Sequence, residues 1–256
     1  MAVHDDTGAP IRVPDRVRRV VSIVPSLTET VAATAPGLLA GATDWCTHPE
    51  GLDVPRVRGT KNPDLERIVG LRPDVVVGNT EENRPADVEA LRAAGVPVWM
   101  TRIRTVEEAL ASLRRMLAEA CRVPVPGWLE EASRVWADVA PGEPRAAVIP
   151  IWRRPWMVVG RDTFTGDVLA RLGVSNVYAG HPERYPKIPL DELNAAGADL
   201  VVLPDEPYRF TADDGPESFP GLDAALVSGR LLTWYGPSLV EAPAALAERL
   251  AAARPR

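Results

Sequence analysis

Segments that favour strands alternate with segments that favour helices, and this alternation constrains the fold more than any other feature of the sequence. Strands are predicted where apolar and β-branched residues run together, and helices where apolar residues recur every three or four positions. In chain order, the sequence predicts a strand at 19–24, helices at 26–35 and 63–71, a strand at 74–77, a helix at 84–94 and a strand at 96–100. Such alternation with short connections is typical of an α/β fold with a mainly parallel sheet.

Capping signals predict where two of these helices begin. Ser26 and Glu29 form a capping box, in which each side chain can accept the backbone amide hydrogen of the other residue. Asn62 is predicted as the N-cap of the next helix, with Pro63 in the first helical position, where no amide hydrogen is needed.

The middle of the chain has a long stretch without a strand signal. Helices are predicted there at 105–122 and 127–139, where apolar residues keep helical spacing, and a new strand is predicted at 145–151. A short helix, a tight turn and a buried strand then occur at 191–203 as they do at 65–77, although unrelated α/β units share that pattern.

From this organisation we predict two Rossmann-like α/β lobes joined by a long backbone helix. The N-terminal lobe is placed at 1–122, the linking helix within 123–142 and the C-terminal lobe at 143–256.

Composition excludes several classes of protein. The formal net charge is −6, so a basic surface for nucleic acid is not expected. No apolar run approaches the ~18 residues of a membrane span, so membrane insertion is not expected. The start of the sequence lacks an apolar signal segment, which predicts a cytoplasmic chain with a frayed N-terminus around His4. The two cysteines, Cys46 and Cys121, fit a reducing compartment and are interpreted as structural.

Common catalytic motifs are missing from the sequence. It contains no GxSxG elbow, no Walker A loop, no HExxH helix and no GxGxxG after a strand. His48 with Asp44, or His181 with Glu183, could supply metal ligands, although such pairs are more often parts of surface loops. We therefore predict no enzymatic activity and no catalytic residue, and metal coordination stays open.

Aromatic residues fall in loops or directly after predicted strands. In a parallel α/β sheet, ligands bind outside the carboxyl ends of the strands, and Trp and Tyr there suit stacking on a broad planar ligand. The alternative is that each ring packs under its own loop as part of the core. The residues concerned are Trp45, Trp152, Trp156, Tyr185, Tyr208, Phe210 and Tyr235.

Several motifs, in order and spacing, resemble the helical-backbone solute receptors, which are the class III binding proteins of ABC importers. The cobalamin-binding branch is the most similar. In the first half the motifs are residues 19–29 (RVVSIVPSLTE), 43–46 (TDWC) with Pro49, and 64–68 (DLERI) with Pro73 and Asp74. In the second half they are residues 151–156 (IWRRPW), 184–186 (RYP) and 205–208 (DEPY) with Phe210.

The resemblance implies a ligand held in a cleft between two lobes and contacted by aromatic side chains. It assigns that role to Trp45, Trp152, Trp156, Tyr185 and Tyr235. Polar selection of the ligand is predicted for Glu81, Glu82, Arg153 and Glu206, with Tyr208 beside them, although these carboxylates could equally pair with neighbouring arginines.

The same resemblance implies a transporter as partner. Surface glutamates of such receptors dock against arginines of the importer, and they correspond here to Glu66 and Glu192. The alternative is that these carboxylates only stabilise the first turn of a helix, by ~0.3–1 kcal/mol. Members of the family are usually periplasmic, or extracellular and membrane-anchored, which differs from the cytoplasmic location expected from the start of the chain.

The sequence as a whole predicts a monomeric binding protein for a corrinoid, with cobalamin as the expected ligand and no resident cofactor. Two alternatives stay open. One is a siderophore, haem or metal-ion receptor of the same fold, and the other is a cytosolic corrinoid-handling enzyme.

Overall fold

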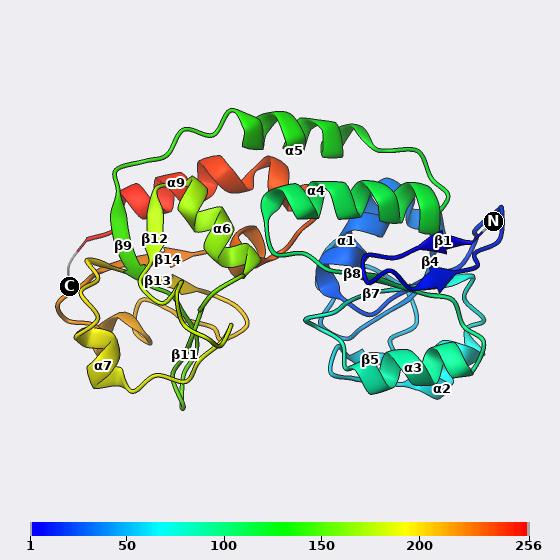
Figure 1. The fold of residues 1–256 in the computed structure, drawn as a ribbon, viewed down its shortest axis with the longest axis horizontal. Helices are drawn as coiled ribbons and strands as arrows, with labels where there is room; N and C mark the ends of the chain where they lie inside the picture. Colours follow the sequence, from blue (N-terminus) through cyan, green and yellow to red (C-terminus); the bar gives the residue numbers. More distant parts are fainter. Residues whose placement is uncertain (1, 255–256) are drawn as a thin grey trace. The chain divides into compact units, whose positions relative to one another are not determined.

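The computed structural model describes residues 2–254, which form two compact units. The first unit comprises residues 2–103, 107–131 and 235–237, and the second comprises residues 104–106, 132–234 and 238–254. Each unit is an α/β sandwich around its own parallel sheet (Figure 1). The predicted α/β class is therefore confirmed, and each unit is described separately below.

The sheet of the first unit has four parallel strands. Their order is β4-β3-β7-β8, with β3 at Val20–Ser22, β4 at Leu39–Ala42, β7 at Val75–Asn79 and β8 at Val98–Thr101. Val20 pairs with Val75 and Val76 with Val98, so the β-branched runs lie side by side in register. Strands buried on both faces are expected to be continuous apolar runs of this kind.

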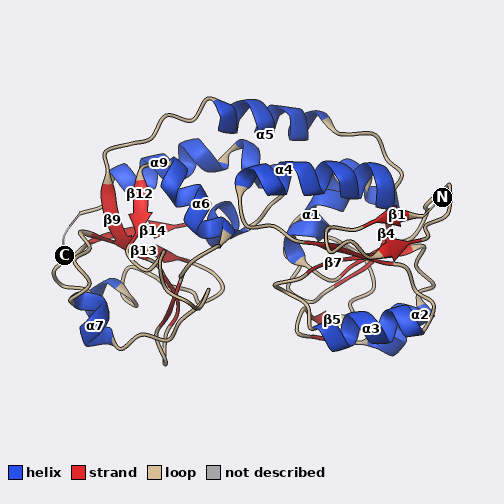
Figure 2. Ribbon diagram, in the orientation of Figure 1, coloured by secondary structure: helices blue, strands red, loops and turns tan. Residues whose placement is uncertain are grey.

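Helices cover both faces of this sheet (Figure 2). They are α1 (Pro25–Thr34), α2 (Leu65–Gly70), α3 (Pro85–Ala93) and α4 (Val106–Arg115), which continues as a π-helical turn at Met116–Ala120. Ile68 and Leu91 of α2 and α3 are fully buried against Val21 and Val76 of the sheet. A hairpin of two short strands, β5 (Arg58–Gly59) and β6 (Asn62–Pro63), precedes α2.

The second unit repeats this design. Its parallel sheet has the order β12-β9-β13-β14, with β9 at Arg145–Val148, β12 at Val174–Asn176, β13 at Leu200–Pro204 and β14 at Asp223–Val227. In both sheets the second strand along the chain lies at one edge, followed by the first, third and fourth strands. The repeat suggested by the sequence therefore extends to the topology of the two sheets.

The remaining helices pack on the second sheet or join the units. They are α5 (Gly127–Ala137), α6 (Phe164–Arg171), α7 (Leu190–Asn194), α8 (Gly229–Thr233) and α9 (Ala242–Ala251). Leu193 of α7 packs with Val148 and Val201 of the sheet, and the hairpin β10 (Pro150–Trp152) and β11 (Met157–Val158) follows β9. The predicted helix at 127–139 is thus present as α5, and the boundary between the units falls within it.

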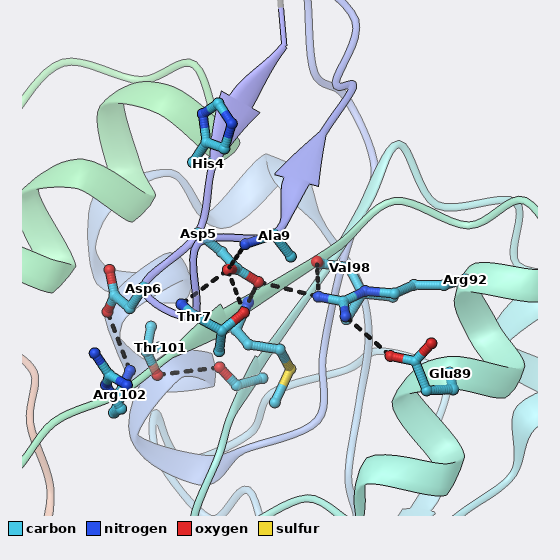
Figure 3. A network of polar contacts seen from close by, with 12 residues as sticks. His4, Asp5, Asp6, Thr7, Ala9, Glu89, Arg92, Val98, Thr101 and Arg102 are labelled. Atoms are coloured by element: carbon cyan, nitrogen blue, oxygen red, sulfur yellow. Dashed lines mark hydrogen bonds and ion pairs between the residues drawn. The ribbon is translucent and has the colours of Figure 1, made fainter.

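The N-terminal segment is ordered, which corrects the expectation that it is frayed. Val3–His4 (β1) pairs with Pro10–Ile11 (β2) as a hairpin. Asp5, whose side chain is fully buried, accepts hydrogen bonds from the amides of Thr7 and Ala9 at 2.9 and 3.0 Å (Figure 3). A buried carboxylate with several donors fixes the turn in place.

Two predicted helix starts were wrong. The first helix begins at Pro25 with Val24 as N-cap and no side-chain cap, because proline needs no acceptor for an amide hydrogen. Asn62 and Pro63 form a strand, and α2 is capped by Asp64, which accepts from the amide of Arg67 at 3.0 Å. No helix within residues 2–254 is long and apolar enough to cross a membrane.

Candidate functional site

The predicted site residues of the first unit follow the carboxyl ends of two strands. Trp45 lies in the loop after β4, and Glu81 and Glu82 lie in the turn after β7. The carboxyl ends of parallel strands are where ligands bind in α/β sheets. The topology therefore brings these loops to one edge of the sheet.

Trp45 rests on the β5–β6 hairpin. A Cβ atom added at Gly59 would lie 3.1 Å from the indole nitrogen of Trp45 and 2.6 Å from Oδ1 of Asn62, so a side chain there would displace one or both of these groups. The amide of Asp44 donates to the carbonyl of Arg58 at 2.9 Å and ties the Trp45 loop to the same hairpin. The indole itself is 68% exposed.

A buried amide network holds the Glu81–Glu82 turn. Asn79 accepts from the amide of Glu81 at 2.8 Å and donates to the Thr101 hydroxyl at 3.0 Å. The Asn83 side chain accepts from the amide of Asn79 at 2.9 Å and donates to the carbonyl of Thr60 at 3.1 Å. Sequence reasoning missed these two asparagines, although an Asn-x-x-x-Asn pattern directly after a strand is a signal for such a turn.

The two glutamates of this turn are half-buried. Burial raises the pKa of Glu82, the charge of Lys61 opposes that rise, and Glu81 adds to it. Lys61 also donates to the carbonyl of Glu81 at 2.5 Å. The turn therefore combines a lysine with a carboxyl group that is easier to protonate than usual.

In the second unit, an aromatic cluster stands above β13 and the β10–β11 hairpin. Trp156 stacks on Phe210, with ring centroids 6.0 Å apart, and meets Phe219 edge-on at 5.2 Å. Tyr208 lies 4.7 Å from Phe210 and contacts Trp152 edge-on at 5.7 Å. Trp152 is the outermost member of this aromatic cluster and is 43% exposed.

Arg153 sits at the centre of the polar groups around the aromatic cluster. Its guanidinium lies 5.3 Å from the centre of the Trp156 ring and pairs with Asp214 and, at 2.7 Å, with Glu217. Asp214 also accepts from the Tyr208 hydroxyl at 2.6 Å, which lowers the pKa of Asp214 and raises that of Tyr208. Arg153 thus pairs with Asp214 and Glu217, two acidic partners that sequence reasoning missed, and not with the glutamates predicted beside it.

Two glycines of the second unit lie very close to the loops that carry Tyr185 and Glu206. A Cβ at Gly160 would lie 2.2 Å from the carbonyl of Glu183, which fixes the loop that carries Tyr185. A Cβ at Gly229 would lie 2.3 Å from Cγ of Glu206. Tyr185 and Glu206 are half-buried.

Tyr235 differs from the other predicted contacts. It is only 7% exposed and belongs to the first unit, apart from the aromatic cluster of the second. Phe210, one of the loop aromatics, is also buried, at 3%, as the alternative of core packing predicts. The roles of the exposed and buried aromatics as ligand contacts stay predictions.

The histidines make local contacts. Nδ1 of His181 accepts from the amide of Glu183 at 3.0 Å, and the His48 ring lies 3.1 Å from the Thr47 hydroxyl. Within residues 2–254, no group of three or more His, Cys, Asp and Glu residues is arranged to hold a metal ion. Both cysteines are buried thiols.

The predicted docking glutamates occupy equivalent elements. Glu66 lies in the first turn of α2 and Glu192 in the first turn of α7, and both are exposed. Each helix leads directly into the third strand of its sheet, β7 or β13. The exposure is as predicted, and docking itself stays a prediction.

The fold is that of the class III periplasmic binding proteins. A periplasmic haem-binding protein from Pseudomonas aeruginosa is 27% identical with a TM-score of 0.74, covering 94% of this chain and 95% of its own. The periplasmic vitamin B12 binding protein of Vibrio cholerae has a TM-score of 0.70 at 16% identity, covering 92% and 97%. The nickel-bound Helicobacter pylori protein has a TM-score of 0.80 at 15% identity, covering 97% and 88%.

Curated relatives confirm the resemblance to the cobalamin-binding branch. The vitamin B12-binding protein of Pectobacterium carotovorum is 23% identical over 210 residues, which cover 76% of this chain and 74% of the relative. The protein of that name from Vibrio parahaemolyticus is 25% identical over 185 residues, covering 69% and 67%. No family model matches the chain.

These comparisons overturn the predicted cytoplasmic location. The structural neighbours from Vibrio cholerae and Pseudomonas aeruginosa are periplasmic proteins. The prediction was wrong because it used the first residues of the sequence as evidence of location, and those residues do not report it.

Proposed function

We propose that this protein is a solute-binding protein for a corrinoid of the cobalamin type. The observation that carries the proposal is the exposure of Trp45 and Trp152, because exposed large apolar side chains are otherwise rare here. Within residues 2–254 only these two and Val69 expose a large apolar side chain. Curated relatives of similar sequence are vitamin B12-binding proteins, which supports the corrinoid as ligand.

Exposing an indole to water is unfavourable in free energy, and a flat ligand that stacks on the ring buries this apolar surface. Burial of apolar surface contributes about 25 cal/mol per Å², and a Trp side chain offers on the order of 200 Å². The glycine beneath Trp45 and the ring beside Trp152 hold both indoles before a ligand arrives. Such preorganisation reduces the entropy lost on binding.

The predicted polar residues would select the ligand. Glu82 and Glu206 can exchange hydrogen bonds with the amide side chains of a corrinoid, and Arg153 supplies a cation held by its acidic partners. We assign no catalytic residue and no resident cofactor, because the corrinoid is the cargo. The class to which the similar proteins belong binds and delivers solutes.

Calorimetric titration with cyanocobalamin tests the proposal. We expect saturable binding that weakens at least tenfold, or ~1.4 kcal/mol, in Trp152→Ala. Val69→Ala is the matched control, since it removes the third exposed apolar side chain, and it should bind as the wild type does. Absence of binding by folded wild-type protein, or equal affinities of both variants, would refute it.

A haem-type ligand is the second candidate. Two haem-binding neighbours share 25% and 27% identity with this chain, more than the B12-binding neighbour does. A ferric porphyrin also carries carboxylates that the Arg153 guanidinium can bind in place of Glu217. Competition between haemin and cyanocobalamin, followed by the Soret absorbance, distinguishes the two ligands.

We further propose an ABC importer as partner, with Glu66 and Glu192 as its contacts. The equivalence of α2 and α7 in the two units supports this proposal. A helix of one turn or two carries each carboxylate, and neither is buried, so both can reach arginines of another protein.

A further inference from the structure

The last strands of the two sheets, β8 and β14, are equivalent edge strands. Both are fourth in the shared strand order, and each pairs with only one neighbour in its sheet. An edge strand presents unpaired amide and carbonyl groups, which another extended segment can bind. The two edges differ in what covers them.

The N-terminal hairpin covers the edge of β8. The amide of Met100 donates to the Asp5 carboxylate at 3.2 Å, and its carbonyl accepts from the amide of Asp6 at 3.2 Å. Arg92 donates to the carbonyl of Val98 at 3.4 Å and pairs with Asp5 at 3.0 Å (Figure 3). The acidic turn of the hairpin, with Asp5 and Asp6, thus covers this edge.

The backbone alternation of β14 fixes which of its residues face outward. The amide of Asp223 donates to the carbonyl of Asp199 at 3.1 Å, and the carbonyl of Val227 accepts from the amide of Asp205 at 3.2 Å. Both contacts lie on the β13 side of the strand. Because inward and outward backbone groups alternate along a strand, the even-numbered residues face the outer edge.

The outer edge of β14 is only partly covered. The amide of Ala224 donates to the carbonyl of Arg254 at 3.2 Å in an isolated antiparallel bridge. Within residues 2–254, the outward amide of Leu226 has no hydrogen-bond partner in the protein. This edge therefore offers one open backbone donor in the middle of the strand.

Two cavities flank Leu226 along this edge, with volumes of about 460 and 300 Å³. Both are lined by Leu226 and Arg249, so they form one groove, which we call the β14 groove. The larger cavity lies toward Ser228, and its lining is about equally polar and apolar. Phe210, Leu231 and Leu246 supply apolar surface, and Asp205 and Glu248 supply carboxylates. The smaller lies between the 212–216 loop and the end of α9, beside Arg254.

We propose that the β14 groove binds an extended peptide segment of a partner protein by strand addition. The segment would pair with the open amide of Leu226, place an apolar side chain in the larger cavity and place an acidic side chain at Arg249 and Arg254. The acidic side chain is assigned to the smaller cavity because its charged lining residues are both arginines, and the carboxylates that cover the equivalent β8 edge follow the same chemistry. This surface is separate from the ligand-contact residues proposed above.

The occupant is a peptide rather than a second sheet because the groove is short. The bridge at Ala224 closes one end, and Ser228, whose hydroxyl accepts from the amide of Leu231 at 3.4 Å, begins α8 at the other. A segment of about five or six residues spans that length, at ~3.3 Å per residue.

The test uses the full chain and a fluorescein-labelled hexapeptide, Asp-Glu-Val-Thr-Leu-Val. We expect a saturable rise in fluorescence anisotropy and, on saturation, slower hydrogen exchange of the Leu226 amide. Arg249→Glu should weaken binding about tenfold, and a peptide with Lys-Lys in place of Asp-Glu should bind wild type about tenfold more weakly.

A matched pair of variants isolates the groove. Ala252→Trp fills the smaller cavity and should abolish binding, whereas Ala251→Trp, on the exposed preceding residue outside the groove lining, should bind as wild type does. No binding at 1 mM peptide, an unchanged affinity in Ala252→Trp, or an unprotected Leu226 amide in the saturated complex would each overturn the proposal. Arg249 is exposed, so Arg249→Glu keeps the test valid if the Trp variant does not fold.

Discussion

At the scale of single residues, the exposed indole of Trp45 depends on the absence of a side chain at Gly59. Gly59→Ala places a methyl group against both Trp45 and Asn62. We expect a loss of less than ~1 kcal/mol in the free energy of unfolding, because both neighbouring side chains are exposed and can move. We also expect cyanocobalamin to bind at least threefold more weakly in calorimetry.

Gly70→Ala is the control for that change. Gly70 ends α2 with no other atom near its potential Cβ, and alanine favours helix by up to ~1 kcal/mol over glycine. This variant should keep the affinity of the wild type and be at least as stable. A Gly59→Ala protein that matches it in both measurements would show that the hairpin does not position Trp45.

Protonation of Glu82 belongs to the same scale. Because its pKa is raised in the folded protein, the folded state binds the proton more tightly than the unfolded state. The contribution of Glu82 to the free energy of unfolding is therefore fully present below the ordinary pKa of glutamate. It is lost as the pH rises through the raised pKa of Glu82 in the folded protein. Glu82→Gln should be more stable than wild type at pH 7, and this advantage should disappear at pH 4.

Urea unfolding across that pH range measures this difference. Glu50→Gln, at an exposed position, is the control and should show no pH-dependent advantage over wild type. If Glu82→Gln is equally or less stable at pH 7, the turn stabilises the ionised carboxylate and our account of it is wrong.

At the scale of elements, two carboxylates hold the β1–β2 hairpin: Asp5, which is buried, and Asp6, which pairs with Arg115 at 2.9 Å. Asp5 accepts from Arg92 and from three backbone amides, those of Thr7, Ala9 and Met100. Asp5→Asn leaves a buried amide group facing these donors, so we expect a loss of about 2–4 kcal/mol in the free energy of unfolding.

Glu89 provides the comparison for Asp5. It pairs with the same Arg92 at 3.1 Å but is 70% exposed, so Glu89→Gln should cost less than ~1 kcal/mol. Urea denaturation followed by circular dichroism measures both. Equal losses in the two variants would mean that the buried Asp5 carboxylate contributes no more to stability than the exposed Glu89 does.

Elements also show where sequence reasoning succeeds. The buried strands β7 and β13 are predicted because continuous β-branched and leucine runs have few other environments. Asn62-Pro63 was misread, because its pairing with Arg58 and Gly59 depends on a hairpin with no strong local signal. The positions of Asp5 and Phe219 depend on partners tens of residues away in the chain, which local patterns do not encode.

At the scale of the whole molecule, the repeated topology predicts that different residues carry ligand binding and transporter docking, so that one can be lost without the other. Glu66→Arg together with Glu192→Arg should leave the affinity for cyanocobalamin unchanged, because both residues are exposed on α2 and α7 and neither is a proposed ligand contact. Uptake of the ligand by proteoliposomes containing the partner importer should fall at least tenfold, since like charges then face its arginines.

Two exposed carboxylates outside α2 and α7, one in each unit, supply the control for that double variant. Glu131→Arg with Glu143→Arg makes the same change in net charge and should retain uptake. An uptake rate that falls equally in both double variants would assign the effect to total charge instead of to docking.

The division of the chain between the units has a consequence for expressing one unit by itself. Residues 235–237 belong to the first unit although they come more than a hundred residues after its other parts. Gly236 approaches Thr30 so closely that a Cβ there would lie 2.9 Å from the hydroxyl. A fragment ending at residue 131 would therefore leave α1 without this neighbour. To isolate the first unit, an engineer would have to supply 235–237 as a separate peptide or rejoin it by circular permutation.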